Sequence, residues 1–89
     1  MKPDFGQAYN NRGLVYQSLS DYDKAIEDGD KAILLQPDFA LAYYFRGVGY
    51  YSQLELDKAI ADFQIVLELN NDPALQQEAR VLLTELGVK

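Results

Sequence analysis

The chain has 89 residues, 48% of them apolar and 25% charged, which is the composition of one small globular domain and not of a disordered segment. It contains no cysteine and no histidine, so disulfides, thiolate chemistry and the commonest zinc ligands are excluded. A net charge of −6 argues against nucleic acid or an anionic membrane as the main partner, and no apolar run is long enough to span a bilayer.

Along the chain, apolar side chains recur with the spacing of amphipathic helices. The first helix is expected over residues 5–19, with a core face formed by Phe5, Ala8, Tyr9, Gly13, Tyr16 and Leu19. The second is expected over residues 22–35, with a core face formed by Tyr22, Ala25, Ile26, Ala32 and Ile33. A third and a fourth helix repeat these two patterns, and a fifth is expected over residues 73–86.

Prolines and aspartates mark the ends of the expected helices. Pro37 cannot continue a helix interior, and Asp38 is expected to accept hydrogen bonds from the free N–H groups of the third helix. Asp72 and Pro73 predict the same kind of cap at the fifth helix, with proline in its first turn. The loops near residues 19–21 and 53–55 are short, which predicts antiparallel hairpins.

The chain repeats itself with a period of 34 residues. Residues 3–36 and 37–70 are identical at fifteen positions when they are aligned without a gap, and both segments open with Pro-Asp-Phe. A period of this length is typical of a solenoid, in which similar helical units stack on one another.

The repeated residues resemble a known family. The segments AYNNRGLVY…DYDKAI and AYYFRGVGY…LDKAI are similar to tetratricopeptide repeats. The resemblance rests on an early aromatic residue, a small residue and a tyrosine in each first helix, a small residue in each second helix, and a closing proline: Tyr9, Gly13, Tyr16, Ala25, Tyr43, Gly47, Tyr50, Ala59 and Pro37.

The sequence departs from the family pattern at four positions. Gly29 stands where the family has an aromatic residue, and we expect a bulky neighbour such as Tyr43 or Tyr44 to fill the space; the alternative is a shallow pocket. Asn71 replaces the closing proline of the second repeat. The hairpin loops lack the usual glycine and carry instead Ser20 and Leu54.

The resemblance implies an all-α fold, an alpha-alpha superhelix in which two helix hairpins and a C-terminal capping helix form a right-handed solenoid. We expect a single domain over residues 1–89, with repeat one at 4–37, repeat two at 38–71 and a half-repeat at 72–87. Because the chain opens on a repeat boundary, we expect it to be a fragment or terminal part of a longer array; the alternative is a free-standing array of two and a half repeats.

Fourteen carboxylates raise the question of a metal or acid–base site. Asp21 and Asp23 have a spacing that occurs in calcium loops, but Ala25 and Ile26 stand where such a loop needs oxygen ligands and glycine. These acids instead suit the positive end of a helix dipole. We therefore predict no catalytic residue, no metal site and no cofactor, and we do not expect an enzyme.

A second apolar stripe follows the third helix, where Leu41, Tyr44, Val48 and Tyr51 fall at i, i+3, i+7 and i+10. In the family that the chain resembles, successive first helices line the concave surface, which implies a groove for a segment of a partner protein. Its expected lining is Asn10, Leu14, Gln17, Leu41, Tyr44, Val48, Tyr51, Leu75 and Glu78.

We expect this stripe to be more exposed than the Tyr9–Tyr16 and Tyr43–Tyr50 pairs. The alternative is that its tyrosines only pack against neighbouring helices. Some family members hold a partner's C-terminal carboxylate with Lys, Asn and Arg side chains in this groove. The matching positions in this chain are Asn10, Leu14, Phe45, Leu75 and Ala79. None of them is a cation, which disfavours binding of a C-terminal carboxylate.

The expected partner is therefore a protein or peptide segment. The alternative function is that of a structural, self-assembling unit, because the open ends leave apolar surface on which copies could stack head-to-tail or swap elements into a homo-oligomer. The lack of a signal peptide, a transmembrane segment and cysteine leads us to expect a cytoplasmic location.

Arginines also recur with the period of the repeat, at Arg12, Arg46 and Arg80. In an antiparallel hairpin, facing residues have a constant index sum, which places Arg12 opposite Asp28 and Arg46 opposite Asp62. We expect these intra-repeat pairs, with a planar guanidinium bound to a carboxylate. The alternative is pairing across repeats, Asp28 with Arg46 and Asp62 with Arg80.

Overall fold

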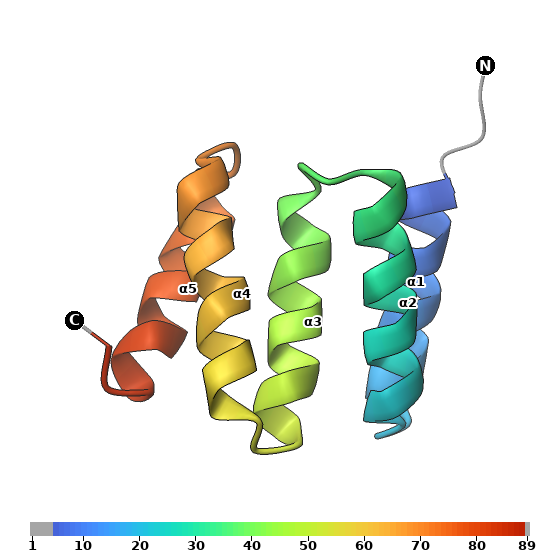
Figure 1. Cartoon of the computed structure of the whole chain (residues 1–89), viewed down its shortest axis with the longest axis horizontal. Coiled ribbons are helices and arrows are strands. Elements are labelled where there is room, and N and C mark those ends of the chain that lie inside the picture. Colours follow the sequence, from blue (N-terminus) through green and yellow to red (C-terminus); the bar gives the residue numbers. More distant parts are fainter. Residues whose placement is uncertain (1–4, 89) are drawn as a thin grey trace.

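A computed structural model describes residues 5–88, and within this range the chain forms five helices and no strand (Figure 1). The helices are α1 (Phe5–Ser18), α2 (Tyr22–Leu35), α3 (Ala40–Ser52), α4 (Leu56–Leu69) and α5 (Pro73–Glu85). The predicted all-α fold is confirmed, and the first and fifth helices are each one residue shorter than predicted. Pro3 and Asp4, where the first repeat was expected to begin, lie outside the described residues.

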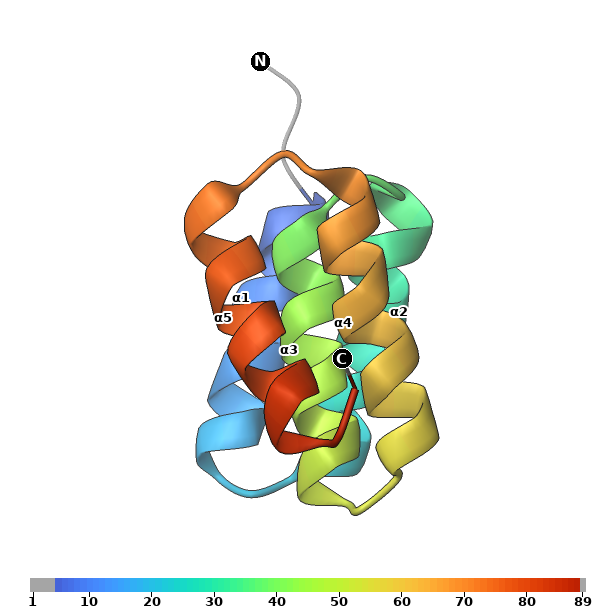
Figure 2. The same ribbon diagram turned by 90° about the vertical axis from the view of Figure 1, so that its left-hand side faces the viewer.

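The helices are arranged as two hairpins and one further helix. α1 packs on α2, α3 packs on α4, and α5 covers α4, while the hairpins meet through α2 and α3. Figure 2 shows α1 and α5 on one side of the molecule and α2 and α4 on the other, with α3 between them. Because α3 also contacts both α1 and α5, the helices that come first in each unit form one layer. Between residues 5 and 88, no helix is both long and apolar enough to cross a membrane.

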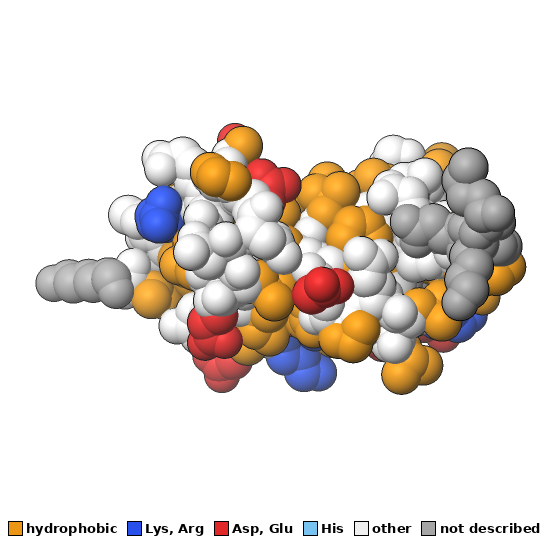
Figure 3. Space-filling model, turned by 90° about the horizontal axis from the view of Figure 1, so that it is seen from above, with side chains coloured by type: hydrophobic (Ala, Val, Ile, Leu, Met, Phe, Trp, Pro, Cys, Tyr) orange, Lys and Arg blue, Asp and Glu red, His pale blue; other side chains and the backbone are white. Residues whose placement is uncertain are grey.

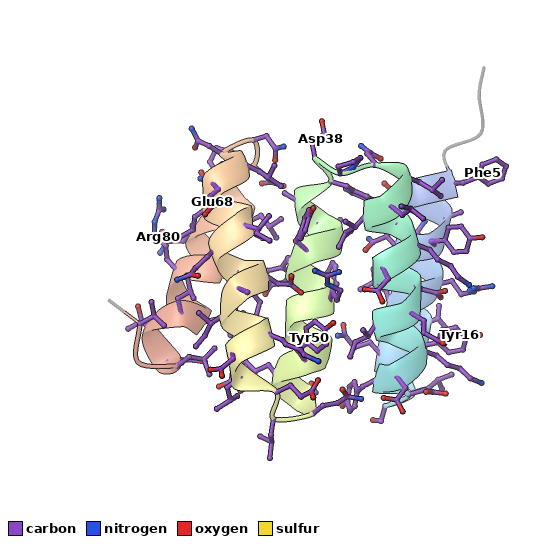
Figure 4. All side chains as sticks on the ribbon, viewed as in Figure 1. Phe5, Tyr16, Asp38, Tyr50, Glu68 and Arg80 are labelled. Atoms are coloured by element: carbon purple, nitrogen blue, oxygen red, sulfur yellow. The ribbon has the colours of Figure 1, made fainter. Side chains whose placement is uncertain are left out.

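One of the two predicted aspartate caps is confirmed and the other is wrong. The carboxylate of Asp72 accepts from the backbone N–H of Leu75 at 3.1 Å, with Pro73 in the first turn, as predicted. The predicted cap by Asp38 is wrong, because α3 begins only at Ala40 and Phe39 takes the capping position without a side-chain bond. Asp38 thus lies one residue too early, in the α2–α3 loop, where its side chain points away from the helices (Figure 4).

The hydrophobic core lies towards the second hairpin and α5. Its largest fully buried apolar side chains are Phe63 and Val66 of α4, and they pack with Leu75 and Leu83 of α5. The first hairpin buries only small or polar residues within its two helices: Gly6, Asn10, Gly13, Ala25, Asp28, Gly29 and Ala32. Close helix packing, rather than large apolar side chains, therefore holds the first hairpin together.

The predicted core face of the first helix is largely wrong. Phe5 and Leu19 are 59% and 70% exposed, and Tyr9 and Tyr16 are only half-buried. The two tyrosine rings lie against the guanidinium of Arg12, with their centroids 5.4 and 5.9 Å from its central carbon. This face of α1 lies at the end of the molecule, where Lys24 and Lys31 of α2 also lie 5.5 and 5.4 Å from the rings of Tyr16 and Tyr9, so the tyrosines serve as cation–π partners rather than as core.

The predicted intra-repeat ion pairs are confirmed. Nε and Nη2 of Arg12 donate to the two carboxylate oxygens of Asp28 at 2.8 and 2.7 Å. The same atoms of Arg46 donate to Asp62 at 2.8 and 2.6 Å. Both aspartates are 2% exposed, so each hairpin encloses a bidentate acceptor. The alternative pairing of Asp28 with Arg46 and of Asp62 with Arg80 is therefore wrong.

Arg46 also joins the two hairpins, which the sequence did not predict. Its Nη1 donates to Asp30 of α2 at 2.9 Å, while the rings of Tyr43 and Tyr50 lie 5.6 and 5.8 Å from its guanidinium carbon. Hydrogen bonding to Asp62 is the main cause that raises the pKa of Arg46. One side chain thus links α2, α3 and α4.

The space at Gly29 is occupied mainly by Arg46 and not, as predicted, by Tyr43 or Tyr44, and a cavity of about 10 Å³ remains beside it. A Cβ on Gly29 would lie 3.1 Å from the Cβ of Arg46 and 3.4 Å from its Cγ, which is closer than ordinary van der Waals contact. The missing side chain lets α3 approach α2 closely enough for Arg46 to reach Asp30. Glycine in a helix costs about 1 kcal/mol relative to alanine, and here it permits this contact between hairpins.

Three residues other than glycine adopt left-handed backbone conformations in the loops. They are Ser20, Leu54 and Asn70, with φ of 60°, 62° and 50°. Ser20 and Leu54 occupy the loop positions where the sequence lacks the expected glycine. A Cβ is unfavourable in this conformation, so both hairpin loops carry strain that glycine would remove.

Asp62→Asn is expected to lower the free energy of unfolding by about 3 kcal/mol, because it leaves the guanidinium of Arg46 without its bidentate acceptor where the side chain is only 20% exposed. Asp28→Asn is the matched variant and should cost less, because the Arg12 side chain is 52% exposed and water can solvate it. Urea denaturation compares the two proteins. Equal losses of unfolding free energy in the two variants would show that the cost does not depend on how deeply the arginine is buried.

Leu54→Gly is expected to stabilise the protein by about 1 kcal/mol, because glycine has no Cβ to strain at φ 62°. In a chain of this size the melting temperature should rise by about 5 °C. Little packing is lost, since the leucine side chain is 77% exposed. Leu54→Ala keeps a Cβ and should not show this gain; an equal rise in both variants would trace the effect to removal of an exposed leucine instead.

Candidate protein-binding groove

The predicted groove residues come from the layer formed by α1, α3 and α5. Seven of the nine reach the surface, six as half-buried side chains and Glu78 as an exposed one: Leu14, Gln17, Leu41, Tyr44, Val48, Tyr51 and Glu78. The other two, Asn10 and Leu75, are 3% and 8% exposed and lie beneath it. Viewed along the helices, hydrophobic side chains gather in the middle of the molecule, between its two ends (Figure 3).

The apolar stripe of α3 lies partly in the core and partly at the surface. Leu41, Tyr44, Val48 and Tyr51 all pack against the buried cluster around Phe63, and all four are half-buried. We predicted that these four residues are more exposed than the Tyr9–Tyr16 and Tyr43–Tyr50 pairs. This prediction is wrong, because those four tyrosines are half-buried too. Tyr43 and Tyr50 also pack against the buried cluster, and each of the four rings lies against the arginine of its own repeat.

Tyr44 has the most closely defined environment in the stripe. Its ring meets Phe45 edge-on at a centroid distance of 5.2 Å and lies tilted against Phe63 at 5.9 Å. Burial raises the pKa of its hydroxyl, and the nearby carboxylate of Glu78 on α5 raises it further. The carboxylate of Glu78 thus acts on the part of the surface where α3 contacts α5.

Gln17 joins the α1 and α3 parts of the surface. Its Nε2 donates to the backbone carbonyl of Phe45 at 3.3 Å, across the boundary between the hairpins. The helical carbonyl of Phe45 gains a side-chain donor, and the side chain of Gln17 is held against α3. The groove residues of the two hairpins are thus fixed relative to each other by a direct bond.

Beneath the groove, the two repeats differ at one pair of positions. The second repeat has the aromatic contact between Tyr44 and Phe63, and the first has Asn10 and Gly29 at the equivalent positions. A cavity of about 10 Å³ remains there, lined by both residues, which is near the lower limit for one water molecule. The Nδ2 group of Asn10 is buried and has no hydrogen-bond partner within residues 5–88.

The positions that match the carboxylate-binding residues of the family carry no cation in this chain. Leu14 and Phe45 are half-buried, and Leu75 and Ala79 are buried apolar residues of the core. Asn10 is the polar member of the set, and its side chain is turned into the cavity described above. Among residues 5–88 there is also no group of three or more side chains suited to hold a metal ion.

Asn10→Leu is expected to raise the free energy of unfolding by about 1 kcal/mol, because leucine has nearly the shape of asparagine and removes a buried donor without a partner. Asn10→Ala is the matched variant; it also removes the donor but enlarges the cavity, so it should be less stable than Asn10→Leu. Thermal and urea denaturation rank the proteins. A loss of stability in Asn10→Leu would show that the Nδ2 group is satisfied in solution, for example by a water.

Comparison with known proteins agrees with this architecture. Residues 6–39 match the family model of the tetratricopeptide repeat. A solved structure described as the first TPR of Spaghetti (RPAP3) bound to the HSP90 peptide SRMEEVD resembles the chain with a TM-score of 0.77 and 28% sequence identity. The match covers 92% of this chain and 66% of that one, so the chain spans slightly less than two thirds of its length. No curated protein matches the sequence significantly.

Proposed function

Because residues 6–39 are a tetratricopeptide repeat and the chain has the fold of such repeats, we propose that it is a protein-interaction module, not an enzyme, that binds a partner segment on the layer of α1, α3 and α5. The observation that carries this proposal is the stripe of Leu41, Tyr44, Val48 and Tyr51, whose large side chains stay half-exposed along a central helix. Tyrosine suits such a surface because an apolar ring carries one polar tip.

The charge of the groove selects the kind of segment. Of the nine groove residues, Glu78 alone is charged, and it lies close to Tyr44. An apolar segment that carries a basic residue near Glu78 is therefore the ligand that the surface fits. The acidic peptide bound by the related structure meets no cation here, so we do not expect this chain to bind SRMEEVD tightly.

A peptide selection tests this proposal. Random peptides displayed on phage are selected against the immobilised full chain, and we expect enrichment of aromatic or aliphatic residues together with Lys or Arg. Binding of the enriched peptides should fall at least tenfold with Glu78→Lys, because the basic residue then meets a like charge. Measured in parallel by fluorescence anisotropy, SRMEEVD should bind more weakly than the enriched peptides.

Glu68→Lys is the matched control, since Glu68 is an exposed glutamate on α4, in the other layer of the molecule (Figure 4). It makes the same change of net charge and should leave peptide binding unchanged. Equal losses in the two variants would assign the effect to net charge, and enrichment of acidic peptides would overturn the proposed chemistry of the groove.

A second candidate function is self-assembly through the ends of the array. Val15 of α1 and Leu19, just after α1, are 57% and 70% exposed at one end, and Val81 of α5 is 48% exposed at the other. Exposed apolar side chains at both ends favour association between copies of the chain. Sedimentation equilibrium decides between the two functions, because a protein that stays monomeric over a wide concentration range does not self-assemble.

A further inference from the structure

The α3–α4 loop carries a leucine where both the backbone and the surroundings disfavour one. Leu54 has a left-handed backbone conformation with φ 62°, and its side chain is 77% exposed. The equivalent residue of the α1–α2 loop is Ser20, with φ 60°, whose small polar side chain adds no apolar surface. In the free chain Leu54 thus combines backbone strain with exposure to water. A strained residue whose side chain the fold does not use points to a function in binding.

The surface around Leu54 offers an apolar anchor together with a negative charge. Residues 54–58 line one shallow hollow at the tip of the second hairpin, and Leu56 is 40% exposed there. Glu55 lies 3.6 Å from the ammonium of Lys58, so these two charges offset each other. The carboxylate of Asp57 makes no hydrogen bond or ion pair with any of residues 5–88. Leu54, Leu56 and Asp57 are called the loop tip below.

A hollow of complementary character lies between α4 and α5. It has a volume of about 260 Å³, and its lining residues are Leu67, Arg80, Leu83, Thr84 and Val88. The hydroxyl of Thr84 donates to the backbone carbonyl of Arg80 at 2.9 Å, so this polar group is already satisfied. The remaining lining is three apolar side chains and one guanidinium. The volume is below the about 300–1,000 Å³ of sites for drug-sized ligands, which suits an inserted side chain instead.

Arg80 differs from the other two arginines of the repeat register because its charge is unpaired. Arg12 and Arg46 both bind aspartates, whereas the exposed side chain of Arg80 makes no hydrogen bond or ion pair with residues 5–88. Figure 4 shows it pointing away from the helices. In a chain with a net charge of −6, an unpaired cation beside an apolar hollow selects a ligand that is both apolar and acidic.

The loop tip and this hollow cannot meet within one molecule. Leu56 begins α4, and Leu67 follows eleven residues later on the same straight helix, about 16 Å along its axis. Figure 1 shows the α3–α4 loop at the lower edge of the molecule and α5 at its left-hand end. A contact between the two therefore requires two copies of the chain.

We propose that the loop tip of one copy docks in the hollow between α4 and α5 of a second copy. Leu54 enters the hollow against Leu67 and Leu83, and the carboxylate of Asp57 pairs with the guanidinium of Arg80. A contact of this size belongs to the weak, transient class of protein interfaces. It uses neither the groove nor the exposed residues of α1, so it goes beyond both proposed functions.

Paramagnetic broadening in NMR spectra tests the contact between two full-length copies. The chain contains no cysteine, so Ser52→Cys provides one attachment point for a nitroxide at an exposed position just before the loop tip. The labelled copy is mixed with an isotope-enriched copy that carries no nitroxide, and only broadening between copies is then observed. We expect the amide signals of residues 83–88 of the enriched copy to broaden and those of α1 to stay sharp.

Leu54→Ser in the labelled copy should remove this broadening. Serine is tolerated in the equivalent loop, where Ser20 has nearly the same φ, so the variant should fold, and its own NMR spectrum checks this. Leu34→Ser is the matched control, because it also replaces an exposed leucine, 81% exposed near the end of α2. It should leave the broadening unchanged. Equal losses in the two variants would show that the copies meet through unspecific apolar contact and would overturn the proposal.

An exchange of charges between the copies tests the ion pair. Asp57→Arg in the labelled copy should weaken association with the unchanged enriched copy at least fivefold, because arginine then faces Arg80. Association should recover when the enriched copy carries Arg80→Glu. A purely structural role of Asp57 in its own helix could not be restored by a change in the other copy, so the absence of recovery would overturn the proposal.

Two further outcomes would also overturn it. One is the absence of broadening at about 1 mM of each copy, where weak complexes are populated. The other is broadening centred on α1, which would show that the copies associate through the ends of the array instead. The groove proposal is tested separately, because Leu54→Ser should bind the selected peptides as tightly as the unchanged chain.

Discussion

The arrangement of this protein depends on the guanidinium of Arg46. It binds Asp62 within its own hairpin and Asp30 in the neighbouring one, so that α2, α3 and α4 are joined at one group. A planar donor with five N–H groups can satisfy two carboxylates at once, which a lysine ammonium cannot do with the same fixed geometry. Charged pairs that are largely buried add little net stability, because desolvation opposes the attraction. Their contribution is to fix how the helices align, which in a repeat protein sets the geometry of the stack.

The two hairpins are built on one pattern but hold together differently. The second buries the aromatic contact between Tyr44 and Phe63 and shares a core with α5. The first has Asn10 and Gly29 at these positions and packs its helices closely around a small cavity. In a solenoid, stability is the sum of terms within repeats and between neighbours, so a repeat with a thin core depends more on its neighbour. Arg46 supplies that neighbour contact, and Gly29 makes room for it.

Periodicity predicted most of the fold, because the identical positions fix helix type, helix spacing and the facing of Arg12 with Asp28. It failed where a residue's environment depends on the next hairpin. Tyr9 and Tyr16 look like core positions in one isolated repeat, yet they lie half-buried beside Arg12, whereas the equivalent Tyr43 and Tyr50 pack against the core. The bond from Arg46 to Asp30 could not be predicted either, since it requires the distance between hairpins. Within the groove, pattern alone did not separate Asn10 and Leu75, which are buried, from the side chains that reach the surface.

The two sides of α1 have different surroundings. Its inner side supplies Leu14 and Gln17 to the groove, and the bond from Gln17 to the carbonyl of Phe45 ties it to α3. Its outer side carries Arg12 and the exposed residues around it. The contacts of α1 with α2 and α3 therefore set both the position of its groove residues and the orientation of its outer side.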